Sequence, residues 1–313
     1  MSAGVVARLL RQDMGRVDFG PRRFRLRPGP AREVLETAGR AFLTGLNASL
    51  ETSGDALAAR IAGLGPELAG FAFEGAGMGC ALLDLLLPRR RHRVDALLRG
   101  PAAGHPHLVH VGVGWAYARL RLRPVRGPAG ADPLLRWLAW DGFGFHQGFF
   151  HADRVIGRQR VERGLHRDVR RVRDQGLGRA LWFCECADPD GVALRIAEFP
   201  EPRRADLWSG AGLAATYAGG ADAGELARLA EESGPYRAHL AQGSAFACAA
   251  RRVAGIVPAH TDKAAEVLTG ADAATAASWT DRALTKLGPR PHALAHYQRW
   301  RAEIRHLWER NSR

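Results

Sequence analysis

Aromatic residues surround a single histidine in the stretch of the sequence best suited to chemistry. Residues 140–150 read WDGFGFHQGFF, with His146 as the only imidazole, Asp141 before it and Gln147 after it. A histidine can accept or donate a proton near neutral pH, and a carboxylate can hold it in one tautomer. The stretch therefore indicates acid–base chemistry by His146, oriented by Asp141 if the fold joins them. A core histidine bonded to a backbone carbonyl is the alternative.

Two other groups of side chains are of metal-binding types. His105, His107 and His110 lie close together in the sequence, and Cys184 and Cys186 flank one glutamate. Neither group has a second cluster at the spacing of a zinc site. The sequence also has no His-Glu-x-x-His run, no glycine loop ending in Lys-Ser/Thr and no Gly-x-Ser-x-Gly motif. We therefore predict no metal and no cofactor.

The glycines beside His146 belong to an internal repeat. Each copy has a pair of glycines two residues apart, such as Gly142 and Gly144, and in the last copy alanine replaces the second glycine. The first glycines are Gly75, Gly112, Gly142, Gly176, Gly210 and Gly243, at spacings of 37, 30, 34, 34 and 33 residues. A period near 34 is typical of stacked helical hairpins, each too small to bury its own apolar face.

When the six copies of the repeat are aligned on their first glycine, two positions distinguish Asp141 and His146. The residue four places after the first glycine is small in five copies and is His146 in the sixth. Because positions i and i+4 share one helix face, we expect this face to approach a neighbour closely, with His146 filling a gap. The residue before the first glycine is polar in five copies: Glu74, Asp141, Gln175, Ser209 and Gln242. Helix N-caps are the favoured interpretation of this position, and a polar ring at the mouth of a pocket is the alternative.

The 313-residue chain is predicted to be all-α, because no alternating strand pattern of useful length occurs. We divide it into a basic N-terminal arm, residues 1–30, and a single helical-repeat domain, residues 31–313. Hairpins of about 34 residues would form an open solenoid or close into an α/α toroid around an internal pocket, which we favour. The helix after Phe143 is expected to run to Gln159. An arginine-rich helix with a solvated face is expected at residues 161–174.

The composition limits the cellular locations and the classes of partner to be expected for the protein. The net charge is +13, carried almost entirely by arginine, and could attract nucleic acid, a membrane surface or an acidic protein. The arginine-rich segment lacks the interleaved aromatics of a single-strand binder, so we expect no nucleic-acid partner. No run of about 20 apolar residues and no secretory signal pattern occur, so we predict a cytoplasmic protein without a membrane span.

Two motifs resemble a family of natural-product biosynthesis. Residues 140–150, WDGFGFHQGFF, and residues 206–220, DLWSGAGLAATYAGG, are similar to the best-defined motifs of an uncharacterised domain family. That family belongs to the core gene cassette of enediyne polyketide biosynthesis, and the similarity extends over roughly residues 17–310. The resemblance implies a role in maturing or protecting a conjugated polyene or enediyne core, without fixing a reaction.

On this basis we expect an accessory protein that binds and processes a conjugated intermediate in an aromatic-lined pocket. A cofactor-independent cyclase or isomerase is conceivable, with His146 and Asp141 as the catalytic residues. The expected substrate-binding residues are Trp140, Phe143, Phe145, Gln147, Phe149, Phe150, Trp208, Ser209 and Tyr217.

The alternative is a non-catalytic helical-repeat protein that binds the intermediate or docks the polyketide synthase. Acyl-carrier domains are typically acidic. The arginines at Arg163, Arg167 and Arg170 could receive such a domain by charge complementarity.

Overall fold

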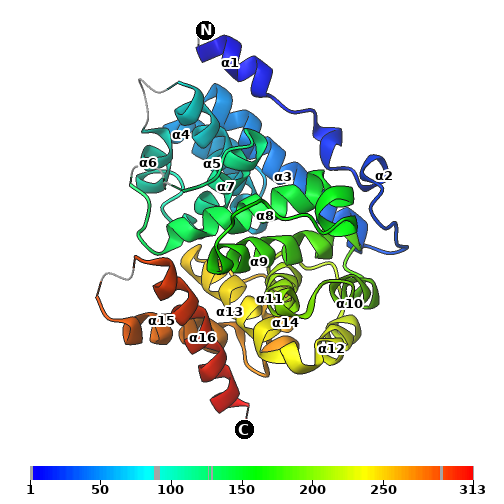
Figure 1. Cartoon of the computed structure of the whole chain (residues 1–313). Coiled ribbons are helices and arrows are strands. Elements are labelled where there is room, and N and C mark those ends of the chain that lie inside the picture. Colours follow the sequence, from blue (N-terminus) through cyan, green and yellow to red (C-terminus); the bar gives the residue numbers. More distant parts are fainter. Residues whose placement is uncertain (1–2, 88–91, 126, 128–129, 290–291, 313) are drawn as a thin grey trace.

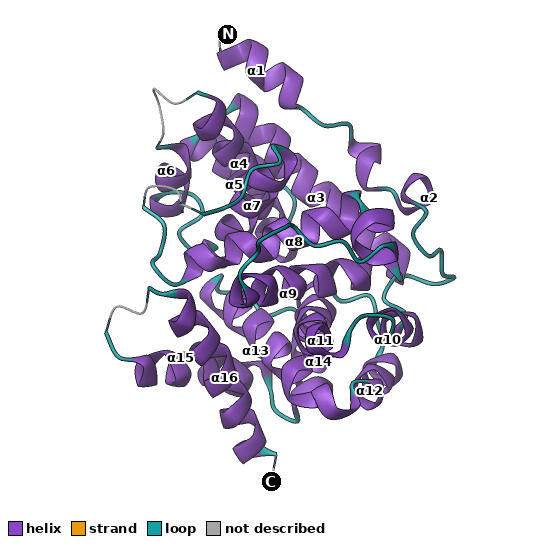
Figure 2. Ribbon diagram, in the orientation of Figure 1, coloured by secondary structure: helices purple, strands orange, loops and turns teal. Residues whose placement is uncertain are grey.

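The structure, a computed structural model, describes residues 3–87, 92–125, 127, 130–289 and 292–312. Within these ranges the chain forms helices and loops and no strand, so the predicted all-α class is confirmed (Figures 1 and 2). The first helix, α1 (Ala3–Leu10), and the last, α16 (Leu294–Asn311), lie at opposite ends of the molecule (Figure 1).

Among the described residues, eight longer helices pack against one another in chain order. They are α3 (Ala31–Glu51), α5 (Pro66–Leu86), α7 (Pro106–Arg119), α8 (Leu138–Phe150), α9 (Arg167–Cys184), α11 (Glu201–Ala218), α13 (Arg237–Val253) and α15 (Ala273–Leu287). Helix α16 turns back and packs on α9, α13 and α15. This serial packing is consistent with the tandem helical units expected from the repeat.

Shorter helices follow most of the long ones. They are α4 (Gly54–Ala62), α6 (Arg93–Arg99), α10 (Pro189–Ala197), α12 (Ala223–Glu232) and α14 (Ala259–Thr269), with a short 3-10 turn, η5 (Gly234–Tyr236), before α13. Helices α10, α12 and α14 pack on each other as an outer layer. In the described residues after α7 and α8 this second helix is missing: only the 3-10 turn η3 (Leu135–Trp137) and the π-helix η4 (Asp153–Gly157) occur there.

The repeated glycines set the register between neighbouring long helices. A Cβ atom on Gly142 of α8 would lie 1.9 Å from the carbonyl oxygen of Val111 in α7, and one on Gly144 would lie 1.9 Å from the carbonyl oxygen of Arg173 in α9. The same kind of contact joins Gly112 to Glu74, Gly176 to Asp141, Gly210 to Gln175, and Gly243 to Ser209. Only glycine permits backbones to approach this closely. The residues before the first glycines therefore lie in one row across the helices.

Two helix boundaries differ from the sequence-based expectation. Helix α8 ends at Phe150 rather than Gln159, and the π-helix η4 follows it. The arginine-rich helix begins at Arg167, because Gly164 takes a left-handed φ of +67° and the His166 side chain caps the new helix. The prediction that the arginines of this helix face solvent is also wrong for Arg173, which is fully buried against Glu162 and Asp174.

The N-terminal arm lies along α3 and reaches the end of α9. It contains α1, the 3-10 turn η1 (Met14–Val17) and α2 (Phe19–Arg22). Its backbone is held at two points: the Phe19 N–H donates to Glu36 (2.8 Å), and the Arg25 N–H donates to the carbonyl of Cys184 (2.8 Å). The side chains of Phe19 and Phe24 are buried. The arm thus contributes side chains to the surface beside the end of α8.

One described helix, α5, is long and apolar enough to cross a membrane by length and composition alone. Of its most apolar window, 78% lies buried inside the protein, as in a core helix that other helices surround.

Candidate functional site

The row of residues before the repeat glycines forms a buried polar chain. Gln175 donates a hydrogen bond to Asp141 (2.8 Å), and Arg179 donates another to the second oxygen of Asp141 (2.6 Å). Ser209 lies within hydrogen-bond distance of both Gln175 (3.2 Å) and Gln242 (3.3 Å). All five side chains are buried.

The N-cap interpretation of this row is wrong. Helix α8 begins three residues before Asp141, and α11 begins eight residues before Ser209, so both residues have helical turns on their N-terminal side. Close glycine packing places the row inside the stack, where polar groups must bond to one another because water is excluded. The alternative, a polar row beside a pocket, is nearer to the structure.

Glu74 adds a second carboxylate to this chain. It accepts a hydrogen bond from the Trp115 indole N–H (2.9 Å) and lies 3.5 Å from the guanidinium of Arg179. Burial raises the pKa of Glu74 to about 7, although Arg179 acts in the opposite direction. The two buried carboxylates of Glu74 and Asp141 hold the buried Arg179 between them. This cluster resembles a structural ion-pair network, which also perturbs pKa values.

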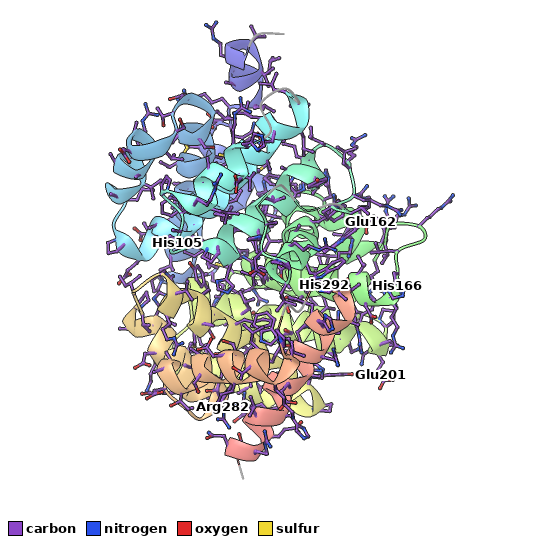
Figure 3. The ribbon with its side chains drawn as sticks, turned by 90° about the vertical axis from the view of Figure 1, so that its left-hand side faces the viewer. His105, Glu162, His166, Glu201, Arg282 and His292 are labelled. Atoms are coloured by element: carbon purple, nitrogen blue, oxygen red, sulfur yellow. The ribbon has the colours of Figure 1, made fainter. Side chains whose placement is uncertain are left out.

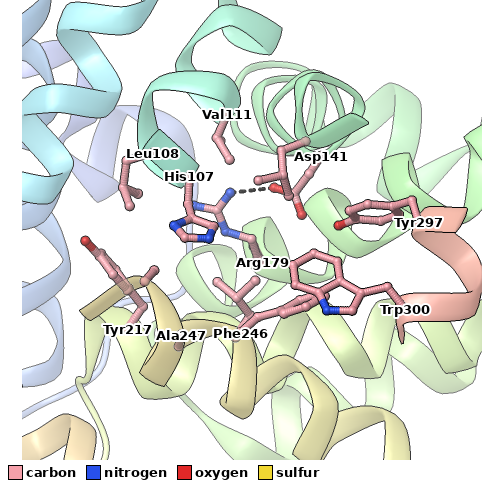
Figure 4. A pocket seen from close by; sticks show the side chains of 13 residues that line it. His107, Leu108, Val111, Asp141, Arg179, Tyr217, Phe246, Ala247, Tyr297 and Trp300 are labelled. Atoms are coloured by element: carbon pink, nitrogen blue, oxygen red, sulfur yellow. Dashed lines mark hydrogen bonds and ion pairs between the residues drawn. The ribbon is translucent and has the colours of Figure 1, made fainter. Parts of the chain in front are cut away.

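A small pocket lies beside this network, and we call it the central chamber. Its polar wall consists of His107, Asp141, Arg179, Tyr217 and Tyr297, and its apolar wall includes Leu108, Val111, Phe246 and Trp300 (Figure 4). The hydroxyls of Tyr217 and Tyr297 have no hydrogen-bond partner among the described protein groups. The chamber has a volume of about 40 Å³, room for a few water molecules and not for a long conjugated chain.

A much larger hollow lies between the N-terminal arm and the end of α8. We call it the arm groove. It is lined by residues 21–25 of the arm, residues 149–154, 156 and 157 at the end of α8 and in η4, and Cys184, Glu185 and Arg195. Its volume is about 890 Å³. It lies where η4 stands in place of a second, outer helix.

Aromatic rings form the inner wall of the arm groove. The Phe149 ring contacts Phe24 of the arm, with ring centroids 5.0 Å apart, and Phe150, with centroids 5.2 Å apart. Phe145 stacks nearly parallel to Phe149 from one helical turn below, at 5.9 Å and 13°. Trp115 of α7 meets Phe150 edge-on at 5.9 Å. The wall is therefore continuous from the arm to α7.

His146 lies directly behind this wall. Its ring is 4.9 Å from Phe150, 5.6 Å from Trp115 and 6.0 Å from His151, measured between centroids, and the residue is 5% exposed. Its Nδ1 has no hydrogen-bond partner within the described part of the chain, so the expected carbonyl bond of a core histidine is absent there.

Burial keeps His146 neutral. Burial, and after it the charges of His151, Arg119, Arg22 and Arg154, together lower the pKa of its imidazole to about 3. Asp141 does not counter this, because its carboxylate is bound to Gln175 and Arg179. Five residues apart on one helix, Asp141 and His146 point about 140° apart around the axis. The structure thus does not bring the expected catalytic pair together.

The other expected substrate-binding residues lie in three places. Phe149 and Phe150 line the arm groove. Phe143 and Gln147 line an adjacent groove of about 390 Å³, which we call the basic groove. Arg154 lines both this groove and the arm groove, and the other residues of the basic groove are 121–123 and 160–163. Trp140, Phe145, Trp208 and Ser209 are buried between helices, and Tyr217 lines the central chamber. Only part of the aromatic set therefore meets at one hollow.

The three expected docking arginines do not share one helix face. Arg163 lies in the loop before α9, whereas Arg167 and Arg170 lie in the first turn of α9. Glu162 and His166, which flank this loop, lie on the same outer side of the molecule (Figure 3). Of the three, only Arg163 belongs to the basic groove.

Several site residues were missed in the sequence. Arg22 and Phe24 belong to the arm, whose run of arginines with one phenylalanine was visible but carried no indication of its contact with α8. Arg119 lies one helical turn beyond Trp115, and nothing in the sequence around it indicated a place in the site. Arg179 was likewise missed, although it stands three residues after the first glycine of its repeat and closes the ion-pair network.

The histidines at residues 105–110 are used for packing. His105 stacks on Phe73 at 4.7 Å, and His110 lies 2.6 Å from the carbonyl oxygen of Pro106. Burial lowers the pKa of His105 and of His107 to about 4. Among the described residues, no three His, Cys, Asp or Glu side chains lie together as a metal site.

Comparison with known proteins identifies a family for this chain. No curated protein and no solved structure matches this chain. A family model described as "Protein of unknown function (DUF1702)" matches residues 2–308, nearly the whole sequence. The chain therefore belongs to the DUF1702 family.

Proposed function

We propose that this protein is an accessory protein of enediyne or related polyketide biosynthesis that binds a conjugated intermediate in the arm groove. The pathway rests on the resemblance of the two motifs at residues 140–150 and 206–220. The site rests on one observation: the continuous wall of Phe24, Phe149 and Phe150 along a hollow of about 890 Å³. A cytoplasmic location is part of the proposal and agrees with four free, buried cysteines.

The size of the hollows favours the arm groove over the central chamber. A drug-sized ligand occupies a pocket of about 300–1,000 Å³, a range that includes the groove and excludes the chamber of about 40 Å³. A conjugated chain is flat and polarisable, so it gains from stacking on aromatic rings. Phe149 and Phe150 differ in ring orientation by 65°, which offers one face and one edge to such a chain.

We further propose that His146 acts as the proton acceptor in a cofactor-free cyclisation or isomerisation. Its imidazole is neutral at physiological pH and lies immediately behind Phe150. With a pKa near 3 it is a weak base in the empty protein, and a negative charge entering the groove would strengthen it. In this proposal Asp141 holds Arg179 and has no catalytic part.

Replacing His146 tests the catalytic part. His146→Gln keeps a polar side chain of similar volume, and we expect it to bind the intermediate yet convert it roughly 10²–10⁴ times more slowly. Product formation from the purified intermediate is the measurement, with His306→Gln as control because His306 is exposed on α16. Unchanged turnover in His146→Gln would refute the role, and so would loss of the folded state, which would make His146 a packing residue.

A second candidate function is docking of an acidic carrier domain without catalysis. The basic groove favours it, since residues 121, 123, 154, 160 and 163 are all arginine and Glu162 is its one acid. We expect a complex with an acidic carrier domain whose dissociation constant rises steeply with salt. Calorimetry at low and at high salt measures this. Salt-independent binding, or none, would exclude the docking function.

A further inference from the structure

Four arginines from four different segments converge on Phe150 and His146. The guanidinium carbon of Arg22, in α2, lies 4.3 Å from the centroid of the Phe150 ring, and that of Arg16, in η1, lies 5.8 Å from it. Arg119 lies one turn beyond Trp115 on α7, and Trp115 contacts both Phe150 and His146. Arg154, in η4, lines the groove beside His151.

These four arginines have no acidic partner in the described part of the chain. Arg22 donates to the carbonyl of Arg16, and Arg154 donates to the amide oxygen of Gln147. Other arginines around the arm are paired with acids: Arg25 with Asp188, Arg27 with Glu225, and Arg40 with Asp18. Two carboxylates, Asp153 and Glu185, also line the arm groove, and Glu185 is paired with Arg195, but neither forms an ion pair with these four arginines.

The unpaired charges are partly withdrawn from water. Burial lowers the pKa of Arg22 and of Arg119, and the neighbouring Arg16 lowers both further. His146 adds an unpartnered ring nitrogen behind the same wall. Partly buried like charges without counter-ions destabilise a fold. A negatively charged group at this place would remove the cost and supply hydrogen-bond acceptors to planar guanidinium donors.

We propose that Arg22, His151 and Arg154, which line the arm groove, form a binding site for an oxyanion, a carboxylate or a phosphate, at its inner end. Arg119 and His146, which lie outside that lining, would complete the site. The site deepens the proposed function, because it would hold the charged end of the groove's ligand while the phenylalanines hold its apolar body. A carboxylate would be the end of a free acid. A phosphate would be the diester of a carrier-bound pantetheine arm. Both are planar or tetrahedral oxygen acceptors that arginine binds with two N–H donors.

Inorganic phosphate and acetate test the site without any polyketide ligand. In isothermal titration calorimetry we expect phosphate to bind to the whole chain, and in NMR of histidine-labelled protein we expect it to raise the pKa of His146. Arg22→Gln and Arg119→Gln should each weaken phosphate binding about tenfold or more, the effect of removing one charge-assisted hydrogen bond. Arg282→Gln is the control, since Arg282 is exposed on α15 at a distant end of the molecule (Figure 3).

Thermal unfolding distinguishes a variant that has lost phosphate binding from one that fails to fold. Without phosphate, Arg119→Gln should unfold at the same or a higher temperature than the wild type, because it removes an unpaired charge. With phosphate, the wild type should gain more stability than Arg119→Gln at the same phosphate concentration. No phosphate or acetate binding, or equal weakening in Arg282→Gln, would overturn the proposal.

Two larger ligands distinguish the sources of the anion. Sorbate, a short conjugated carboxylate, should bind more tightly than acetate if the site holds the end of a free acid. Pantetheine 4′-phosphate should bind more tightly than inorganic phosphate if it holds a carrier arm. Phosphate binding with no affinity for a neutral conjugated chain would uphold the anion site and reject the proposed function, so the two can fail separately.

Discussion

At the scale of single residues, the buried histidines make stability depend on pH. The folded-state pKa is about 3 for His146 and His239 and about 4 for His105 and His107, against an ordinary value near 6.5. Between these values and 6.5 the unfolded chain binds protons that the folded protein does not bind. The free energy of unfolding is therefore highest above pH 6.5 and falls as the pH falls toward 4.

Denaturant unfolding at a series of pH values measures this slope. Each such histidine adds at most about 1.4 kcal/mol per pH unit within its window. We expect His146→Gln to unfold with a visibly smaller slope between pH 6.5 and 4.5 than the wild type. Identical slopes in wild type and His146→Gln would mean that His146 titrates normally in the folded protein.

The sequence predicted the odd residue of the repeat but not its surroundings. His146 stood out because the other copies have glycine or alanine at its position, and in the structure it lies against α7 at that place. The predicted pairing of His146 with Asp141 does not form, because the angle between the two side chains around the α8 axis directs Asp141 between the packed helices. Its real neighbours, Arg22 and Arg119, come from segments with no sequence pattern in common with α8.

At the scale of helices, the paired glycines act as contact points between neighbours. Gly142→Ala would place its Cβ 1.9 Å from the carbonyl oxygen of Val111, so the two helices would have to separate. We expect a loss of several kcal/mol, in the range of severe overpacking or loss of folding. Gly224→Ala is the matched control: this glycine is exposed in α12, its Cβ would have only ordinary contacts, and the change should stabilise by up to about 1 kcal/mol.

Urea unfolding of the two variants measures the difference. If Gly142→Ala were as stable as the wild type, the close packing of α7 and α8 would be refuted. If Gly224→Ala were destabilised as strongly as Gly142→Ala, close approach could not be the cause of the loss, because a Cβ on Gly224 would have only ordinary contacts.

The helical stack was predictable because its cause is local in each repeat. A glycine pair in five copies, with Gly243 and Ala245 in the sixth, reveals the period, and the register follows from the same glycines. The ends of the helices were not predictable in this way. The π-helix η4 replaces the expected last turns after Phe150, and no residue type in that stretch requires it. The prediction that Asp141 and Ser209 are helix N-caps is wrong because their helices begin further upstream.

At the scale of the whole molecule, the interruption of the outer layer and the position of the arm define the candidate site. Helices α10, α12 and α14 cover the second half, whereas α8 is followed by η4 and loop. The arm lies beside this region and brings Phe24 and Arg22 to Phe149 and Phe150. No sequence pattern could have predicted this, because the contact joins distant segments through tertiary packing.

The central claim, a conjugated ligand in the arm groove, has a direct test. The protein is purified from a strain with the pathway intact and its bound species is identified by native mass spectrometry. We compare the wild type with Phe150→Ala in the groove and with Phe246→Leu in the wall of the central chamber. We expect a conjugated polyketide species on the wild type and on Phe246→Leu, and its loss from folded Phe150→Ala. A species retained by Phe150→Ala and lost from Phe246→Leu would contradict it and place the ligand in the chamber.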